Sequence, residues 1–332
     1  MLGVLITIAV AVTASVTAEQ DIRYCSVPDE QLYVYRVPKH NCGCNKNSEG
    51  TLRYHNKKLQ ICNGETYVDV GGGFPASTAA PTKPPTTTPK PTPKPTTPPP
   101  LGDKDNPGRT CNDIASKRSG SRDGYYYLKN GATVTKAYCY MGYICGSRGW
   151  TMIMKINGRS RTFQYDSGYW RNKATYNPGG AASGLGQQET KLETYWTYPF
   201  SSLCLGMKVG GTRWLRVNYR ASSLYSVIAP GRYRGFRVGR NAWKNWVPGS
   251  SLQRNCNREG FNVIGHPIHS RARIGIIGNQ ENECTHPDSR IGLGTGGRAC
   301  GENDGNSAGN EARCDSDNGN KSIYGFGYIF AQ

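Results

Sequence analysis

The chain has few histidines, and it lacks the common catalytic motifs. None of its five histidines lies in a His-Glu-x-x-His frame, and no Gly-x-Ser-x-Gly sequence is present, so the signatures of zinc proteases and of α/β-hydrolases are missing. After residue 18 no apolar run is long enough to cross a bilayer. No long stretch shows a 3.6-residue apolar period either. These absences predict a chain that is not an enzyme, spans no membrane and is poor in helix.

The one long apolar run stands at the N-terminus, where residues 2–18 carry no charge. Val16 and Ala18 give a small-residue cleavage pattern just before Glu19, which indicates a secretory signal peptide over residues 1–18. An uncleaved membrane anchor is the alternative, but the run is short for a span and no basic cluster follows it. We therefore expect a secreted, extracellular protein.

Acidic residues are scarce: the chain has 23 Asp and Glu but 41 Lys and Arg, and its formal net charge is +18. Such a charge favours anionic partners, and for a secreted chain these are acidic glycans and acidic matrix proteins rather than nucleic acid. Solubility alone also explains many of the charges. The segment 233–246 mixes cations with aromatics, and it is either a site for an anionic glycan or a solvated basic face with buried Trp anchors.

Cysteine, in contrast, is abundant. Twelve cysteines in a secreted chain predict disulfides. Residues 75–100 hold 11 Pro and 8 Thr, so they cannot pack a core, and we expect an extended, O-glycosylated linker there. We accordingly assign residues 19–74 to a small four-Cys module, 75–108 to a mucin-like linker and 109–332 to a domain with eight cysteines.

Short strands punctuated by turns dominate both modules. In the small module, turns are expected at Asn56 and at Asn63–Gly64. In the larger domain, apolar and aromatic runs predict strands over residues 150–156, 214–219, 261–264, 274–277 and 324–330. The connections are long and polar, so disulfides or ions must hold them. The predicted fold class is α+β, rich in strands and loops and stabilised by disulfides.

Residues 297–320 form an acidic island in this basic chain. Carboxylates, amides and backbone carbonyls on a loop suit Ca²⁺, although the spacing fails the EF-hand template. The acids proposed as Ca²⁺ ligands are Glu302, Asp304, Asp315 and Asp317. A solvated loop rich in Gly and Asn, closed by a bond between Cys300 and Cys314, is the alternative.

Two further motifs have weaker signals. Asn320 opens the one Asn-x-Ser/Thr sequon in the chain, and it is a glycosylation candidate. The run "GLGTGG" at 292–297 matches the spacing of a dinucleotide-binding loop, but no helix-forming sequence follows it. Its glycines are expected to allow a close backbone approach instead.

The order of several residues resembles the opening of a fibrinogen C-terminal-like domain, which intelectin-type lectins share. The first part of the pattern consists of Cys111, Ile114, Gly124, Tyr126, Leu128, Tyr138, Cys139 and Met141. The second part consists of Gly149, Trp150, Thr151, Phe163 and Trp170. The run "SRIGLGTGG" and the final strand "IYGFGYIFAQ" are similar to the C-terminal end of fibrinogen-like domains in cnidarian secreted proteins. Some of those proteins belong to the organic matrix of stony-coral skeletons.

This resemblance implies a disulfide between Cys111 and Cys139. It also implies recognition of glycans or acidic extracellular surfaces, often with Ca²⁺ as a structural or bridging ion. The expected function is that of a non-enzymatic extracellular matrix protein in the organic matrix of a calcified skeleton. A soluble, Ca²⁺-dependent defence lectin that binds microbial carbohydrate is the alternative. In the family the calcium-binding Asp-x-Asp pair precedes a short disulfide loop, whereas Asp315 and Asp317 follow Cys314.

Overall fold

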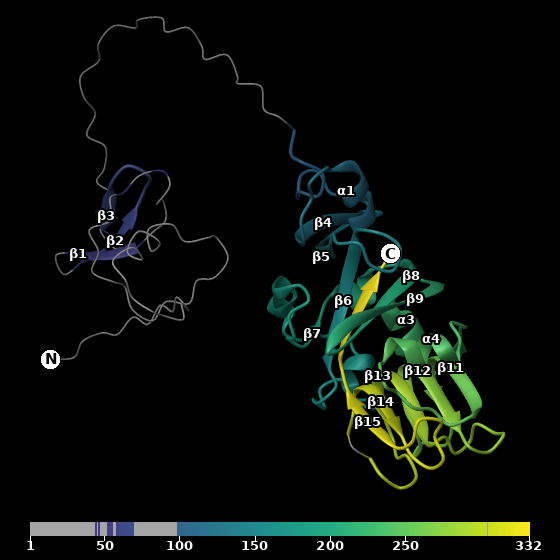
Figure 1. Cartoon of the computed structure of the whole chain (residues 1–332). Coiled ribbons are helices and arrows are strands. Elements are labelled where there is room, and N and C mark those ends of the chain that lie inside the picture. The colour runs from purple at the N-terminus through teal and green to yellow at the C-terminus, as the bar shows by residue number, and fades with distance from the viewer. Residues whose placement is uncertain (1–43, 45, 47–51, 56–57, 70–97, 304) are drawn as a thin grey trace, which may run out of the picture. The chain divides into compact units, whose positions relative to one another are not determined.

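The computed structural model divides the chain into two compact units, residues 1–92 and 93–332. It describes residues 44, 46, 52–55, 58–69, 98–303 and 305–332 (Figure 1). The predicted signal peptide and the linker up to residue 97 lie outside the described residues, as do Asn56, Cys25 and Cys42.

The first unit contains a three-stranded antiparallel sheet in the order β1-β2-β3. Its strands are β1 (Leu52–His55), β2 (Lys58–Cys62) and β3 (Tyr67–Asp69). The turn between β2 and β3 lies where the sequence predicts one, because the side-chain oxygen of Asn63 accepts hydrogen bonds from the N–H groups of Glu65 and Thr66. A disulfide joins Cys44 to the buried Cys62, so β2 is covalently held to the residues before the sheet.

The first sheet of the second unit has seven antiparallel strands (Figure 1). Its order is β4-β5-β6-β16-β8-β9, with β7 paired to β6. The strands are β4 (Gly124–Asn130), β5 (Thr133–Tyr140), β6 (Trp150–Asn157), β7 (Thr190–Lys191), β8 (Phe200–Val209), β9 (Gly211–Ala221) and β16 (Phe326–Ala331). Apolar clusters lie on both of its faces, which explains why β6 is buried at successive positions rather than at alternate ones.

The second sheet is a meander of six strands that follow the order of the chain. Its strands are β10 (Arg234–Gly235), β11 (Asn255–Ile264), β12 (Arg271–Asn279), β13 (Ser289–Gly296), β14 (Ala308–Ala312) and β15 (Lys321–Tyr324). Most of "GLGTGG" is part of β13, and Gly292 faces Gly275 of β12. A Cβ atom on either glycine would clash with the backbone of the opposite strand. These glycines therefore allow close backbone approach, as the sequence predicts.

Within the described residues, helices are few and short. They are α1 (Cys111–Lys117), α2 (Thr194–Thr197), α3 (Leu224–Ile228) and α4 (Arg240–Trp246), with 3₁₀ turns η2 (Gly168–Trp170) and η3 (Pro178–Ser183). Side chains from both sheets, such as Leu205 of β8 and Ile274 of β12, share one buried core with α3 and α4. The predicted β-rich, disulfide-stabilised class is thereby confirmed. In the described part of the chain, no helix is both long and apolar enough for a membrane span.

The strand predicted over residues 324–330 is in fact two strands in different sheets. Tyr324 ends β15, and Phe326 begins β16. Between them Gly325 donates its N–H to Ala308 and accepts from Gly158 through its carbonyl. A Cβ atom at position 325 would clash with the sulfur of Met207. Glycine therefore lets the chain change sheets here without displacing the Met207 side chain.

Four disulfides hold the loops of the second unit. They are Cys111–Cys139, Cys145–Cys204, Cys256–Cys284 and Cys300–Cys314. The first is the pair that the resemblance implies, and the last closes the acidic loop.

The folded unit also includes residues that the sequence analysis assigned to the linker, because Gly102 and Gly108 make backbone hydrogen bonds with Tyr127 of β4.

Candidate functional site

The acids proposed as Ca²⁺ ligands have separate surroundings. Glu302 is exposed and pairs with Arg313 at 2.7 Å. Asp315 is exposed, with φ of +54°, and Asp304 lies outside the described residues. No group of three or more His, Cys, Asp or Glu side chains within the described ranges is arranged to hold a metal ion.

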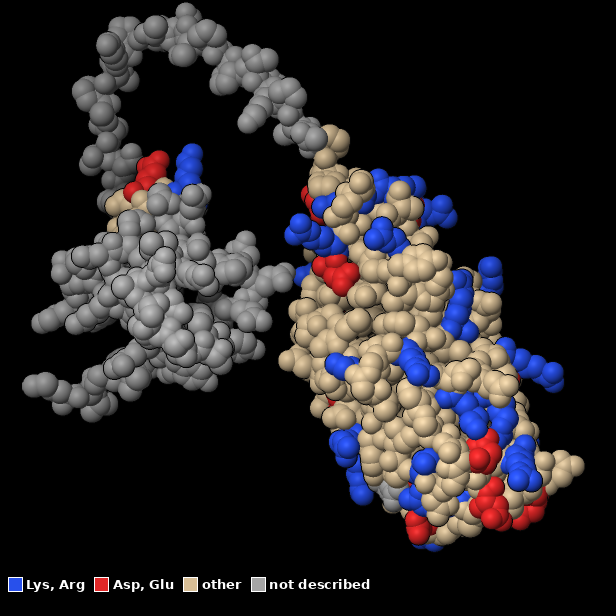
Figure 2. All heavy atoms as spheres, in the orientation of Figure 1, with Lys and Arg blue, Asp and Glu red and all other residues tan. Residues whose placement is uncertain are grey.

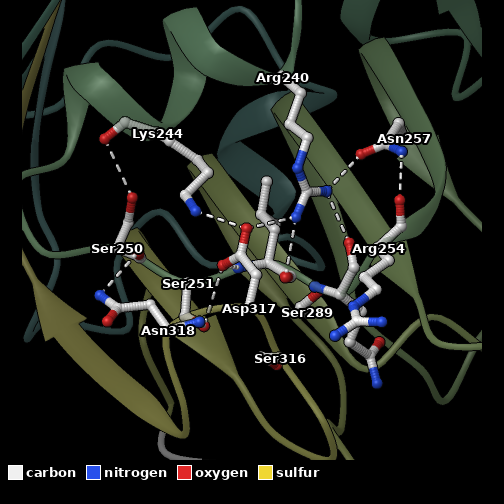
Figure 3. Close-up of polar contacts among 12 residues, drawn as sticks. Arg240, Lys244, Ser250, Ser251, Arg254, Asn257, Ser289, Ser316, Asp317 and Asn318 are labelled. Carbon is white, nitrogen blue, oxygen red and sulfur yellow. Dashed lines mark hydrogen bonds and ion pairs between the residues drawn. The ribbon is translucent and has the colours of Figure 1, made fainter.

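Asp317 is the centre of a polar cluster that joins α4 to the loop after Cys314 (Figure 3). One carboxylate oxygen accepts from Arg240 at 2.7 Å and from Lys244 at 2.5 Å. The other accepts from the N–H of Leu252 at 3.1 Å. These contacts join Asp317 to α4 and to the residues just after it, which lie 65 to 77 residues earlier in the chain, so Asp317 fixes the position of the helix.

Arg240 extends this cluster to β11. Its guanidinium also donates to the carbonyls of Leu252 and Gln253 and to the side-chain oxygen of Asn257 (Figure 3). The charge of Arg240 is therefore used within the protein and is not free to contact a ligand.

The charge of Asp317 is well stabilised. Partial burial tends to raise its pKa, but hydrogen bonds from Lys244, the Leu252 N–H and Arg240 outweigh this and lower the pKa to about 2. Both oxygens are occupied by donors, and two cations lie in direct contact. A Ca²⁺ ion at this carboxylate would meet strong repulsion, so the surroundings of Asp317 do not fit a Ca²⁺ ligand. Calcium binding elsewhere in this loop stays a prediction.

Replacing Asp317 with Asn is expected to lower the free energy of unfolding by about 1–2 kcal/mol at neutral pH, because solvent screening of this partly exposed carboxylate reduces the full value. The folded pKa is depressed, so this stability is present above about pH 4 and is lost as the pH falls towards 2. Urea unfolding of both proteins at pH 7 and pH 3 measures the effect.

The matched control is Asp315→Asn, which changes an exposed acid two residues away and should alter stability by less than about 0.5 kcal/mol. The same proteins test the calcium prediction, because equal melting temperatures in Ca²⁺ and in EDTA would contradict a calcium site in the loop. A drop in EDTA that Asp315→Asn abolishes would instead support a calcium site in the loop.

The aromatic and cationic residues of segment 233–246 occupy different places. Trp243 and Trp246 are 0% and 2% exposed, and their indole N–H groups donate to Glu259 and to the Leu205 carbonyl. The tryptophans are thus buried anchors, which is one of the two alternatives left open by the sequence.

The arginines of this region, in contrast, lie at the surface. Arg232, Arg234 and Arg237 are all exposed, and we call them the arginine edge because Arg234 lies in β10, the outermost strand of its sheet. None of the three forms an ion pair with a described residue. Tyr233 stands among them with 47% exposure. Figure 2 shows more Lys and Arg than Asp and Glu on the face of this unit that is in view.

Two lysines are fully buried on neighbouring strands, although no sequence pattern predicts their burial. The ammonium group of Lys155 donates to the carbonyls of Gly180, Gly184 and Gly186 and to the Ser183 hydroxyl. The ammonium group of Lys191 lies 4.6 Å from the ring centre of Tyr195. Both have 0% exposure, and burial lowers the pKa of each to about 8. No acid contacts either ammonium among the described residues, so neutral oxygens and rings alone balance these charges.

These pKa values predict an alkaline optimum of stability. Below pH 8 the buried lysines are charged in both states, and folding bears their full desolvation cost. Between pH 8 and 10.5 the folded protein releases these protons first, so the free energy of unfolding rises by up to about 1.4 kcal/mol per pH unit for each lysine. Burial raises the pKa of Tyr138 and of Tyr328 to about 12, so stability falls again above about pH 10, where unfolded tyrosine ionises.

Chemical denaturation from pH 7 to pH 11 tests this profile. We expect a maximum at about pH 9 to 10. Lys155→Met removes one of the two groups and should make the rise about half as steep. A flat profile between pH 7 and pH 10 would contradict the assignment.

The sequon residue Asn320 is exposed, and it immediately precedes β15. Its side chain is thus accessible to glycosylation. Glycosylation at Asn320 stays a prediction.

Comparison of the sequence with models of known protein families finds no match, and comparison with curated proteins finds none either. The resemblance to fibrinogen-like domains thus rests on the residues quoted above and stays a prediction.

Proposed function

We propose that this chain is a secreted, non-enzymatic extracellular matrix protein whose larger unit binds acidic glycans. The matrix of a calcified skeleton is the setting that the resemblance suggests. Five disulfides in the described residues and the absence there of a membrane-spanning helix are consistent with an extracellular protein.

The observation that carries this proposal is the arginine edge. Arginine presents a planar fork of donors that matches sulfate and carboxylate groups. Because these three guanidinium groups lack acidic partners within the described residues, a ligand need not displace an existing ion pair. Tyr233 is held in place by its hydroxyl, which donates to the Glu259 carbonyl at 3.0 Å, and its exposed ring can stack on a sugar.

Neighbouring contacts keep this edge rigid. Glu259 accepts hydrogen bonds from the N–H groups of Val238 and Gly239 and from the indole of Trp243. Asp317 fixes the following helix through Arg240 and Lys244. The cations are thus displayed on a fixed backbone, which reduces the entropy lost on binding.

Replacing Arg232, Arg234 and Arg237 together with Ala should weaken binding to a sulfated polysaccharide such as heparin by about tenfold at about 0.15 M salt. Each exposed contact contributes about 0.5 kcal/mol, and 1.4 kcal/mol corresponds to a factor of ten. Isothermal titration of the full secreted chain measures the dissociation constant.

The matched control is the triple replacement of Arg122, Lys129 and Arg148 with Ala, which removes the same charge from exposed positions elsewhere on the unit. Equal losses in both triple variants would show that net charge alone drives binding and would contradict the proposal. Tighter binding to an acidic polypeptide than to the polysaccharide would identify acidic matrix proteins as the partners instead.

A further inference from the structure

Three of the five histidines in the chain lie together in the second unit. His266 and His269 come from the connection between β11 and β12, and His286 comes from the connection between β12 and β13. The ring centres are 5.0 Å apart for His269 and His286, 6.1 Å for His266 and His269, and 6.3 Å for His266 and His286. Three imidazoles bound to one Zn²⁺ ion in tetrahedral geometry have ring centres about 5 Å apart.

The backbone beneath these rings is fixed. The N–H of His266 donates to the Thr285 carbonyl at 2.6 Å, and the N–H of Ser270 donates to the Pro287 carbonyl at 3.0 Å. The bond between Cys256 and Cys284 holds the second connection to β11. The two connections are therefore joined before any ligand arrives, which is the preorganisation that a metal site needs.

In two of the rings, a carboxylate lies close to the Nδ1 atom. Nδ1 of His269 lies 3.7 Å from Asp288, and Nδ1 of His286 lies 3.5 Å from Glu283. Metal-binding histidines commonly direct one nitrogen to a carboxylate, which leaves Nε2 for the metal and makes the ring more basic.

Nδ1 of His269 is also buried, and it has no hydrogen-bond partner in the described structure. Unpartnered buried polar atoms are uncommon and call for an explanation. A metal on Nε2 would place the proton of this ring on Nδ1, facing Asp288, and a small turn of the ring would complete that hydrogen bond.

We propose that His266, His269 and His286 form a site for a divalent transition-metal ion, with Zn²⁺ as the reference ion and water in the fourth position. The site differs in residues and in chemistry from the arginine edge, and it does not depend on the function proposed above. Imidazole nitrogens select zinc and copper rather than calcium.

The rings do not yet meet at one point, in agreement with the lack of a preformed metal group among the described residues. His266 must approach the other two by about 1 Å to reach tetrahedral spacing. His266 and His286 are exposed, so their rings have room to turn, whereas His269 is only 21% exposed at its side chain and is the most buried member of the group.

The test uses the full secreted chain without a histidine tag, freed of metal and titrated with Zn²⁺ by calorimetry at pH 7.4. We expect one Zn²⁺ ion per chain. His286→Ala and His269→Ala should each weaken binding more than 100-fold. Asp288→Asn keeps an oxygen that can accept from the Cys300 N–H but removes the charge beside His269, and it should weaken binding 10- to 100-fold. His55→Ala, in the first unit, is the matched control and should bind as the unchanged protein does.

Substitution with Co²⁺ gives a second readout that does not depend on affinity. Three imidazoles and one water should produce the intense visible absorption of tetrahedral Co²⁺, and His286→Ala should abolish it. Because His286 is exposed, loss of folding is not expected in that variant, and circular dichroism verifies this. Unchanged Zn²⁺ binding in both His variants, or no Zn²⁺ binding by the unchanged chain, would overturn the proposal.

Discussion

Replacing Glu311 with Gln is expected to lower the free energy of unfolding of the larger unit by about 3–5 kcal/mol. Glu311 of β14 pairs with Arg290 of β13, and both side chains have 0% exposure. Arg290 also donates to the hydroxyl of Ser270 at 3.1 Å. Without the carboxylate, the guanidinium stays charged in the core, because arginine does not lose its proton in proteins. Urea unfolding at neutral pH measures the loss.

The control for this prediction is the double variant Arg290→Met with Glu311→Leu. It removes both charges and keeps similar volumes, so it should be markedly more stable than Glu311→Gln alone. If the double variant were the less stable of the two, the cost would come from lost packing and not from an unpaired charge.

Replacing Trp243 with Ala should have a similarly large effect, about 3–5 kcal/mol, because it opens a cavity in the core. The ring of Trp243 is fully buried, and its centre lies 5.5 Å from that of Trp246 and 6.3 Å from that of Phe236. Its indole also holds Glu259, the residue that supports the backbone behind the arginine edge. Thermal and urea unfolding test stability, and heparin titration tests binding.

Trp243→Phe separates the two roles of this residue. It keeps most of the ring but loses the hydrogen bond to Glu259, so we expect a smaller cost of about 1–3 kcal/mol. Heparin binding by Trp243→Phe should weaken if Glu259 positions the arginines. Unchanged binding would mean that Trp243 serves only the core.

Ion pairing with Asp317 explains why the arginine edge is available for a ligand while the neighbouring cations are not. Arg240 and Lys244 are used by Asp317, whereas Arg232, Arg234 and Arg237 have no acidic partner in the described structure. Cations that look alike in the sequence therefore divide into a structural set and a surface set, and only the second is suited to bind an anion.

The sequence by itself determined the features that depend on local patterns. The apolar run at 150–156 is β6, and the Asn63–Gly64 pair makes the turn between β2 and β3. Strand and turn preferences act over a few neighbouring residues, so they can be read without knowing the fold. The glycines of "GLGTGG" likewise allow close backbone approach, since lack of a side chain is a property of the residue itself.

The tertiary structure alone decided which charges meet. Asp317 and Arg240 are 77 residues apart, and Glu311 is a core residue although it stands in the acidic island beside solvated acids. The run 324–330 looks like one strand, yet it divides at Gly325 because the two halves pair with different sheets. Partners of this kind depend on long-range strand order, which places β16 between β6 and β8, and a local pattern carries no information about that order.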